Sequence, residues 1–174
     1  MIPDRGGYPA AGPLNFLPRP LLEPRRPLVA IATGWATAFI PSILLAWLVT
    51  SLMPAGTQPE FEVDGTFAVL MLVVFAPVIE TLIMAAILSL LLRFVSPTAA
   101  VLASAVLWGI AHSLIAPAWG LVIWWPFLVF STLYVTWRQR SLLMALAMPA
   151  IVHGLQNLVP AVLLLYGQTG SPAA

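Results

Sequence analysis

Four polar side chains interrupt long apolar stretches of this chain: Glu80, His112, His153 and Asn157. A carboxylate beside an imidazole can hold and deprotonate a water molecule and later return the proton to a leaving group. A second imidazole, together with an amide, can donate hydrogen bonds to a developing oxyanion. These four residues therefore include the groups that hydrolysis by an activated water needs.

The same residues have other uses. Glu80, His112 and His153 have the ligand count of a catalytic zinc site, with one position left open for water. Ionisable groups inside a membrane also form proton or ion paths. Because the chain has no HExxH spacing, we expect no cofactor, and zinc held by these three residues is the alternative. In the structural alternative each polar group only makes a hydrogen bond between helices.

Glu80 lies near the middle of an apolar run, 67–95, whose only other charged residue is Arg93. Such a run can cross a bilayer, which takes about 20 helical residues. A carboxylate at the midplane costs roughly 2.5 to 3.5 kcal/mol on insertion scales, so Glu80 must face a protein interior or a wet cavity. Pro77, one turn earlier, removes a backbone donor and predicts a kink that frees a carbonyl near Val73.

Three of the polar residues share one depth. Glu80 lies thirteen residues from Arg93, and His153 lies thirteen residues from Arg140. His112 lies fifteen residues from Pro97, at the same end of its helix. At 1.5 Å per residue these depths are about 20, 20 and 22 Å. Asn157 lies on the same face as His153, one turn further on. We therefore expect the four side chains to form one site.

The composition places the chain in a membrane. Of 174 residues, 61% are hydrophobic and 7% are charged, whereas soluble domains have about 25% charged residues. All seven basic residues are arginine and the net charge is +1, which gives no basic surface for nucleic acid. The absence of cysteine excludes disulfides, thiolate nucleophiles and cysteine-ligated zinc.

The apolar pattern predicts an all-α, polytopic bundle of about five transmembrane helices. Proline, glycine and short polar turns separate these apolar segments. The expected helices are 28–53, 67–93, 97–115, 119–137 and 141–165. They form a domain over 28–166, preceded by a loose tail at 1–27 that lies on the membrane surface near Leu14 to Leu22, and followed by a polar tail at 167–174.

Charge placement predicts the orientation. Every arginine falls in the N-terminal tail, the second connection or the fourth connection, whereas the first connection carries only the acids Glu60, Glu62 and Asp64. Because cytoplasmic flanks collect basic residues, we expect a cytoplasmic N-terminus in a bacterial inner membrane. The first apolar run is too long for a signal peptide, so we expect a retained helix.

Three short motifs resemble the CPBP intramembrane protease family, also called Abi or CAAX-protease-like. The family's EExxxR is similar to Glu80-Thr81-Leu-Ile-Met-Ala85, its FxxxH to Trp108-Gly-Ile-Ala-His112, and its HxxxN to His153-Gly-Leu-Gln-Asn157. The motifs occur in the family's order, and the resemblance covers about residues 67–165.

The resemblance implies that Glu80, His112, His153 and Asn157 are the reactive set. It implies an intramembrane endopeptidase acting on a membrane protein or a lipid-anchored peptide, without a nucleic-acid partner. Three positions depart from the motifs, since the second Glu is Thr81, the Arg is Ala85 and the Phe is Trp108. These departures leave a second class open, a non-enzymatic immunity or assembly factor that keeps the polar cluster for packing.

Overall fold

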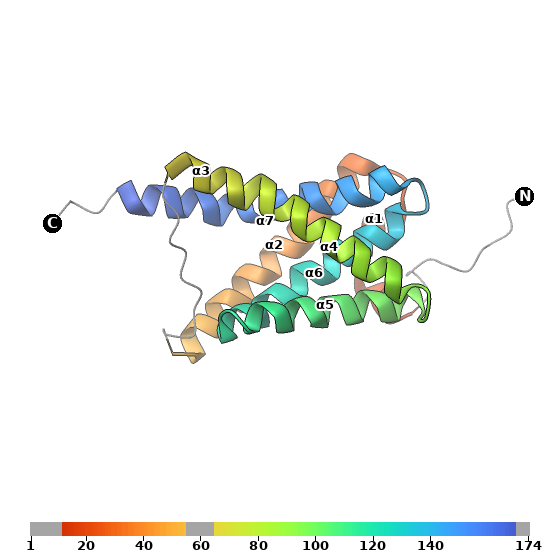
Figure 1. Ribbon diagram of the computed structural model, residues 1–174, viewed down its shortest axis with the longest axis horizontal. Helices are drawn as coiled ribbons and strands as arrows, with labels where there is room; N and C mark the ends of the chain where they lie inside the picture. The colour runs from red at the N-terminus through yellow and green to blue at the C-terminus, as the bar shows by residue number, and fades with distance from the viewer. Residues whose placement is uncertain (1–11, 55–64, 170–174) are drawn as a thin grey trace, which may run out of the picture.

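The computed structural model describes residues 12–54 and 65–169, and these residues are helical with short connections (Figure 1). In chain order the elements are η1 (Pro13–Phe16), α1 (Arg19–Leu22), α2 (Pro27–Leu52), α3 (Gly65–Leu70), η3 (Met71–Phe75), α4 (Ala76–Leu91), α5 (Pro97–Ser113), α6 (Pro117–Trp137) and α7 (Leu142–Thr169). The segment η3 is a π-helical turn that joins α3 and α4 into one rod. The predicted all-α class is confirmed.

Four helices are long and apolar enough to cross a membrane. They are α2, the rod Gly65–Leu91, α6, and the part of α7 from Leu142 to Leu163. The remaining apolar helix, α5, has 17 residues and is about 26 Å long, which is less than the hydrocarbon thickness of about 30 Å. The chain is therefore a polytopic membrane protein; within the described residues four helices are long enough for a full span, and α5, one of the five expected helices, is shorter.

Side-chain caps and prolines determine where helices begin. Pro97 opens α5, where its missing N–H would have no helical partner, and the preceding Ser96 accepts a hydrogen bond from the Ala99 N–H at 3.3 Å. Ser141 caps α7 in the same way, because its Oγ accepts from the Met144 N–H at 3.1 Å. At the far end α7 continues to Thr169, so the expected C-terminal tail begins inside a helix, and residues 170–174 lie outside the described part.

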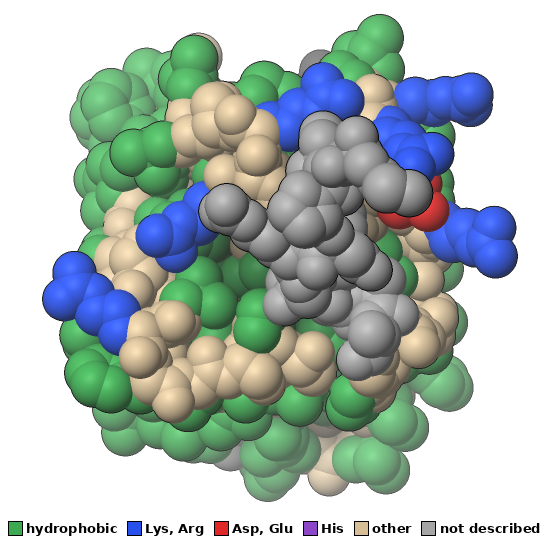
Figure 2. Space-filling view, turned by 90° about the vertical axis from the view of Figure 1, so that its right-hand side faces the viewer, with side chains coloured by type: hydrophobic (Ala, Val, Ile, Leu, Met, Phe, Trp, Pro, Cys, Tyr) green, Lys and Arg blue, Asp and Glu red, His purple; other side chains and the backbone are tan. Residues whose placement is uncertain are grey.

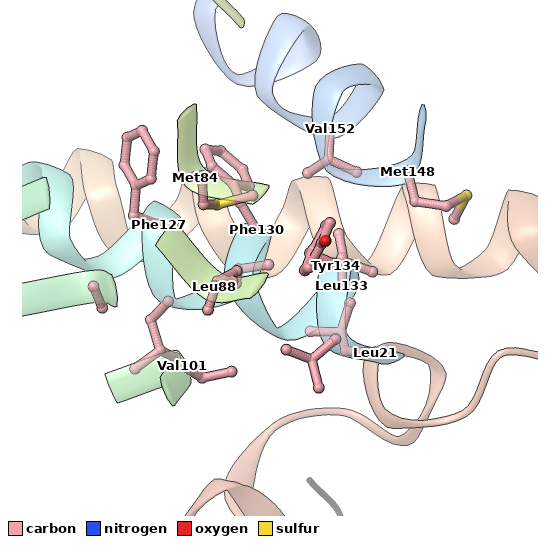
Figure 3. Packing of buried hydrophobic residues seen from close by; sticks show 14 of the residues in the cluster. Leu21, Met84, Leu88, Val101, Phe127, Phe130, Leu133, Tyr134, Met148 and Val152 are labelled. Carbon is pink, nitrogen blue, oxygen red and sulfur yellow. The ribbon is translucent and has the colours of Figure 1, made fainter. Parts of the chain in front are cut away.

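Helix α6 lies at the centre of the bundle. Its second half, from Pro126 to Trp137, is buried at every position. Figure 3 shows its side chains Phe130, Leu133 and Tyr134 among residues of α4, α5 and α7. Two side-chain hydrogen bonds add to this packing, since Ser131 donates to Ser104 of α5 at 2.9 Å in the interior and Tyr134 shares a partly buried one with Ser89 of α4 at 2.8 Å. Helix α6 thus positions every helix that carries a predicted site residue.

Helices α5 and α6 come into backbone contact at two glycines. A Cβ added to Gly120 would clash with the Gly109 carbonyl oxygen and the Ser113 Oγ, and it would lie 2.8 Å from the Ser113 backbone nitrogen. On the facing helix a Cβ on Gly109 would lie 3.2 Å from the Gly120 carbonyl oxygen. Small residues allow such backbone contact between membrane helices, and this one fixes the end of α5 that carries His112.

The N-terminal region differs from the expected loose tail. Residues 12–26 form η1 and α1, and four leucines of this segment are at most 4% exposed: Leu14, Leu17, Leu21 and Leu22. Helix α1 packs against α2 and α6, and the Leu21 side chain lies against Gly34 of α2. The four leucines bury apolar area that a surface position would leave in contact with polar headgroups. The expectation of a loose tail is wrong for these residues, and residues 1–11 lie outside the described part.

The described arginines gather at one end of the bundle. Figure 2 shows this end, where the connections after α4 and α6 meet the start of α2. All six are exposed: Arg19, Arg25, Arg26, Arg93, Arg138 and Arg140. Glu23 accompanies them, with its carboxylate 3.6 Å from Arg25. The acidic connection that carries Glu60, Glu62 and Asp64 lies outside the described residues.

Candidate functional site

Glu80 lies at the border of the buried face of α4. That face consists of residues spaced three or four apart, as expected for one side of a helix: Pro77, Thr81, Met84, Ala85 and Leu88. The Glu80 side chain is 26% exposed, so its carboxylate reaches the edge of the bundle interior while the helix backbone remains packed.

The Glu80 carboxylate approaches His153 of α7. The distance between Oε2 of Glu80 and Nε2 of His153 is 3.8 Å, and the His153 side chain is 7% exposed. This distance is longer than a hydrogen bond, and at such a separation one water oxygen can contact both groups. The two residues come from different helices and are 73 positions apart in sequence, so tertiary packing creates the pair.

Two phenylalanines of α6 hold the His153 ring. Phe130 stacks on it with ring centroids 4.7 Å apart, and Phe127 meets it edge to face at 5.4 Å. Within the described part of the chain the buried Nδ1 of His153 has no hydrogen-bond partner. Because Nε2 is the nitrogen that faces the carboxylate, we assign the proton of the neutral ring to Nε2. His153 therefore directs a donor toward Glu80.

His112 of α5 has the opposite tautomer. Its Nδ1 lies 2.9 Å from the Trp108 carbonyl oxygen, and since a carbonyl only accepts, Nδ1 carries the proton and the neutral ring keeps a lone pair on Nε2. Trp119 meets the ring edge-on at 4.7 Å, and Phe127 lies 5.8 Å away. Phe127 of α6 thus lies beside both histidine rings.

Asn157 of α7 faces the π-helical turn. Its Nδ2 donates a hydrogen bond to the Leu72 carbonyl oxygen at 3.0 Å. One turn earlier on α7, a Cβ added to Gly154 would lie 2.7 Å from the Val73 carbonyl oxygen. The turn η3 and the helix α7 are therefore in backbone contact directly before the α4 turn that carries Glu80.

The four predicted residues thus have different neighbours. Glu80 and His153 approach each other to 3.8 Å, His112 is one aromatic ring away, and Asn157 contacts the rod that carries Glu80. Sequence reasoning missed Phe127 and Phe130, although two aromatic residues three apart on an apolar helix mark one face. It also missed that Asn157 donates a hydrogen bond to the Leu72 carbonyl. The free carbonyl expected near Pro77 was the signal that could have indicated this bond.

The three residues proposed as zinc ligands are not assembled as a ligand group. Among the described residues, no three histidine or acidic side chains lie close enough together to hold a metal ion. A catalytic zinc needs three protein ligands at about 2.0 to 2.2 Å, and only Glu80 and His153 have a direct contact. As the described residues are arranged, these three side chains do not form a zinc site.

The fold and this site together define a class of protein, a polytopic helical membrane protein with a carboxylate and two histidines facing its interior. A family model described as type II CAAX prenyl endopeptidase Rce1-like matches residues 62–159, which include all four predicted site residues. The chain belongs to this Rce1-like family, which is generally a family of CAAX-type membrane proteases. The match confirms the resemblance seen in the motifs. Searches of curated proteins and of solved structures find no significant match.

Proposed function

We propose that this protein is an intramembrane endopeptidase that hydrolyses a peptide bond of a membrane-associated or lipid-anchored substrate with a water activated by Glu80. The observation that carries the proposal is the approach of Glu80 and His153 across two helices, with 3.8 Å between Oε2 and Nε2. Family membership supports it, because the matched segment includes both residues.

In the proposed reaction Glu80 accepts a proton from a water molecule whose oxygen attacks the substrate carbonyl carbon. His112 is proposed to assist the water, since its Nε2 keeps a lone pair that can accept a hydrogen bond. The Nε2 proton of His153 faces the site and donates a hydrogen bond to the oxyanion of the tetrahedral intermediate. Glu80 then returns its proton to the leaving amine nitrogen as the carbon–nitrogen bond breaks, which leaves a carboxyl and an amino product.

A second candidate is a non-enzymatic membrane factor, such as an immunity or assembly protein. The observation that favours it is the environment of Thr81 and Ala85, which are 3% and 7% exposed in the apolar face of α4. At these positions the motif resembled has a Glu and an Arg, so this chain has two buried, uncharged side chains where the motif has charged groups.

The membrane proteome distinguishes the two candidates. Cells that carry Glu80→Gln should accumulate uncleaved membrane proteins or lipid-anchored precursors relative to cells with the wild-type protein, because glutamine keeps the size but loses the base. An unchanged proteome at equal protein level would favour the non-enzymatic candidate. Accumulation of soluble proteins alone would contradict entry of the substrate through the membrane.

We propose that the end of the bundle with exposed arginines faces the cytoplasm of a bacterial cell, which places the N-terminus inside. Reporter fusions after Met1 and in the turn at Gln139 should therefore report the cytoplasmic side, and fusions at Gly65 and Gly170 the opposite side. A cytoplasmic signal at Gly170 would contradict this topology. It would also mean that one of the five expected helices does not cross the membrane, and α5 is the one that is shorter than a full span.

We propose that the reaction proceeds without a metal ion. Purified protein dialysed against a chelator should keep at least half of its cleavage rate, because the proposed chemistry uses only Glu80 and the two histidines. Metal content measured by elemental analysis gives an independent readout. Zinc bound at close to one ion per chain and lost in His153→Ala would contradict the metal-free mechanism.

A further inference from the structure

The π-helical turn leaves backbone carbonyls without their usual donors. In an α-helix the Ala76 N–H would donate to the Leu72 carbonyl, four residues back. In this turn it donates instead to the Met71 carbonyl, five residues back, so Leu72 loses its α-helical donor. The residue five positions after Leu72 is Pro77, which has no N–H. Neither helical pattern therefore supplies a donor to the Leu72 carbonyl, and a buried carbonyl without a partner is costly in a membrane.

Helix α7 supplies the hydrogen-bond donor that the rod lacks. The Asn157 amide donates to the Leu72 carbonyl at 3.0 Å, and Gly154 leaves space for the adjacent Val73 carbonyl, which a Cβ would approach to 2.7 Å. His153 is next to Gly154 in sequence and contacts Glu80. A single stretch of α7 thus contacts both the π-helical turn and the carboxylate that follows it.

The conformation of this turn determines the direction of Glu80. A π-helical turn inserts one extra residue relative to an α-helix, and one residue corresponds to about 100° of rotation. Helix α3 also packs against α7, so the rod is held on both sides of the turn. If the turn became α-helical while α3 kept its place, Glu80 would rotate by about 100° and lose its approach to His153.

We propose that Asn157 is a positioning residue, which holds the π-helical turn through the Leu72 carbonyl and thereby keeps Glu80 facing His153. This inference rests on the proposed function of Glu80. It differs from the oxyanion role expected for Asn157, because the amide directs an N–H to the protein backbone and acts on the reaction through the helix that carries Glu80.

A double-mutant cycle between Asn157→Ala and Pro77→Ala tests the proposal. The assay is cleavage of a purified precursor that accumulates in Glu80→Gln cells. Asn157→Ala should lower kcat at least tenfold and change KM less than twofold. Pro77→Ala removes the proline ring and permits the α-helical hydrogen bond from residue 77 to the Val73 carbonyl, so the turn can become α-helical and kcat should again fall. Since both changes release the same turn, the double variant should be within about threefold of the slower single variant.

Two further measurements separate positioning from packing. The pH–rate profile of Asn157→Ala should move by at least half a pH unit, because the environment of Glu80 changes, whereas a loss of folded protein would leave its shape unchanged. Leu158→Ala, at an exposed neighbouring position on α7, is the matched control and should stay within twofold of wild type. If Asn157→Ala does not fold, Pro77→Ala alone must still lower kcat and move the profile.

Losses that multiply in the double variant, together with an unmoved pH profile, would overturn the positioning role and favour direct contact of Asn157 with the oxyanion. That result would leave the proposed function intact, provided that Glu80→Gln is inactive. Full cleavage by Glu80→Gln would instead remove the function on which the inference rests.

Discussion

Glu80→Gln should lower the rate of substrate cleavage by about 10²- to 10⁴-fold, the range that general acid–base groups contribute. Glutamine keeps the shape and one acceptor oxygen, so helix α4 and its contact with His153 remain sterically unchanged. It cannot accept the proton of the attacking water, and it cannot return a proton to the leaving amine. The measurement is initial cleavage rate with purified protein in lipid vesicles, at matched amounts of folded protein.

The matched control is Glu23→Gln. It makes the same change at a carboxylate at the arginine-rich end of the bundle, where Glu23 pairs with the exposed Arg25, and exposed pairs contribute little to stability. We expect a rate within twofold of wild type. Glu80→Asp, which shortens the base by one methylene, should lie between the two. Equal rates for wild type and Glu80→Gln would rule out Glu80 as the base.

Gly120→Ala should cause the largest loss of stability among single methyl additions in the described part. The new Cβ would clash with the Gly109 carbonyl and the Ser113 hydroxyl, and two of the atoms that it meets belong to the α5 backbone and cannot rotate away. Overpacking costs about 1 to 3 kcal/mol in well-packed cores and sometimes more. We expect a loss at the upper end of this range or above, measured as the fraction of folded protein during denaturant titration in detergent.

Gly12→Ala is the control for this prediction. Its added Cβ would meet only the Thr98 Oγ1 at 3.7 Å, an ordinary contact, so stability should change by less than about 0.5 kcal/mol, as for most surface substitutions. Gly120→Ala should also reduce cleavage, since α5 carries His112. A Gly120→Ala protein as stable as wild type would mean that α5 and α6 separate at low cost.

The sequence was sufficient for the parts of the fold that depend on hydrophobicity and helix breakers. Apolar runs and prolines indicated the all-α class, and the expected helix at 97–115 begins at Pro97 as in the structure. The buried leucines of η1 and α1 could not be found in this way, because their short apolar stretch lies among prolines and arginines. Only the tertiary contact with α2 and α6 makes its burial favourable.

The site was predictable to the level of helices and depths, and less so for side-chain contacts. Equal depth placed Glu80 and His153 at one level, and they approach each other in the structure. The bond from His112 to the Trp108 carbonyl and the bond from Asn157 to Leu72 depend on rotamers and on helix rotation. Neither quantity follows from spacing alone, since one π-helical residue changes the rotation by about 100°.

The burial of Leu21 has a consequence for the order in which the chain assembles. The position of a Cβ on Gly34 lies 3.2 Å from Leu133, 3.3 Å from Leu21 and 3.4 Å from Val152, so Leu21 converges on Gly34 together with side chains of α6 and α7. During synthesis Leu21 leaves the ribosome more than a hundred residues before these partners exist. The contacts of Leu21 beside α6 and α7 can therefore form only after these helices have been made, so complete docking of α1 is a late step of biogenesis.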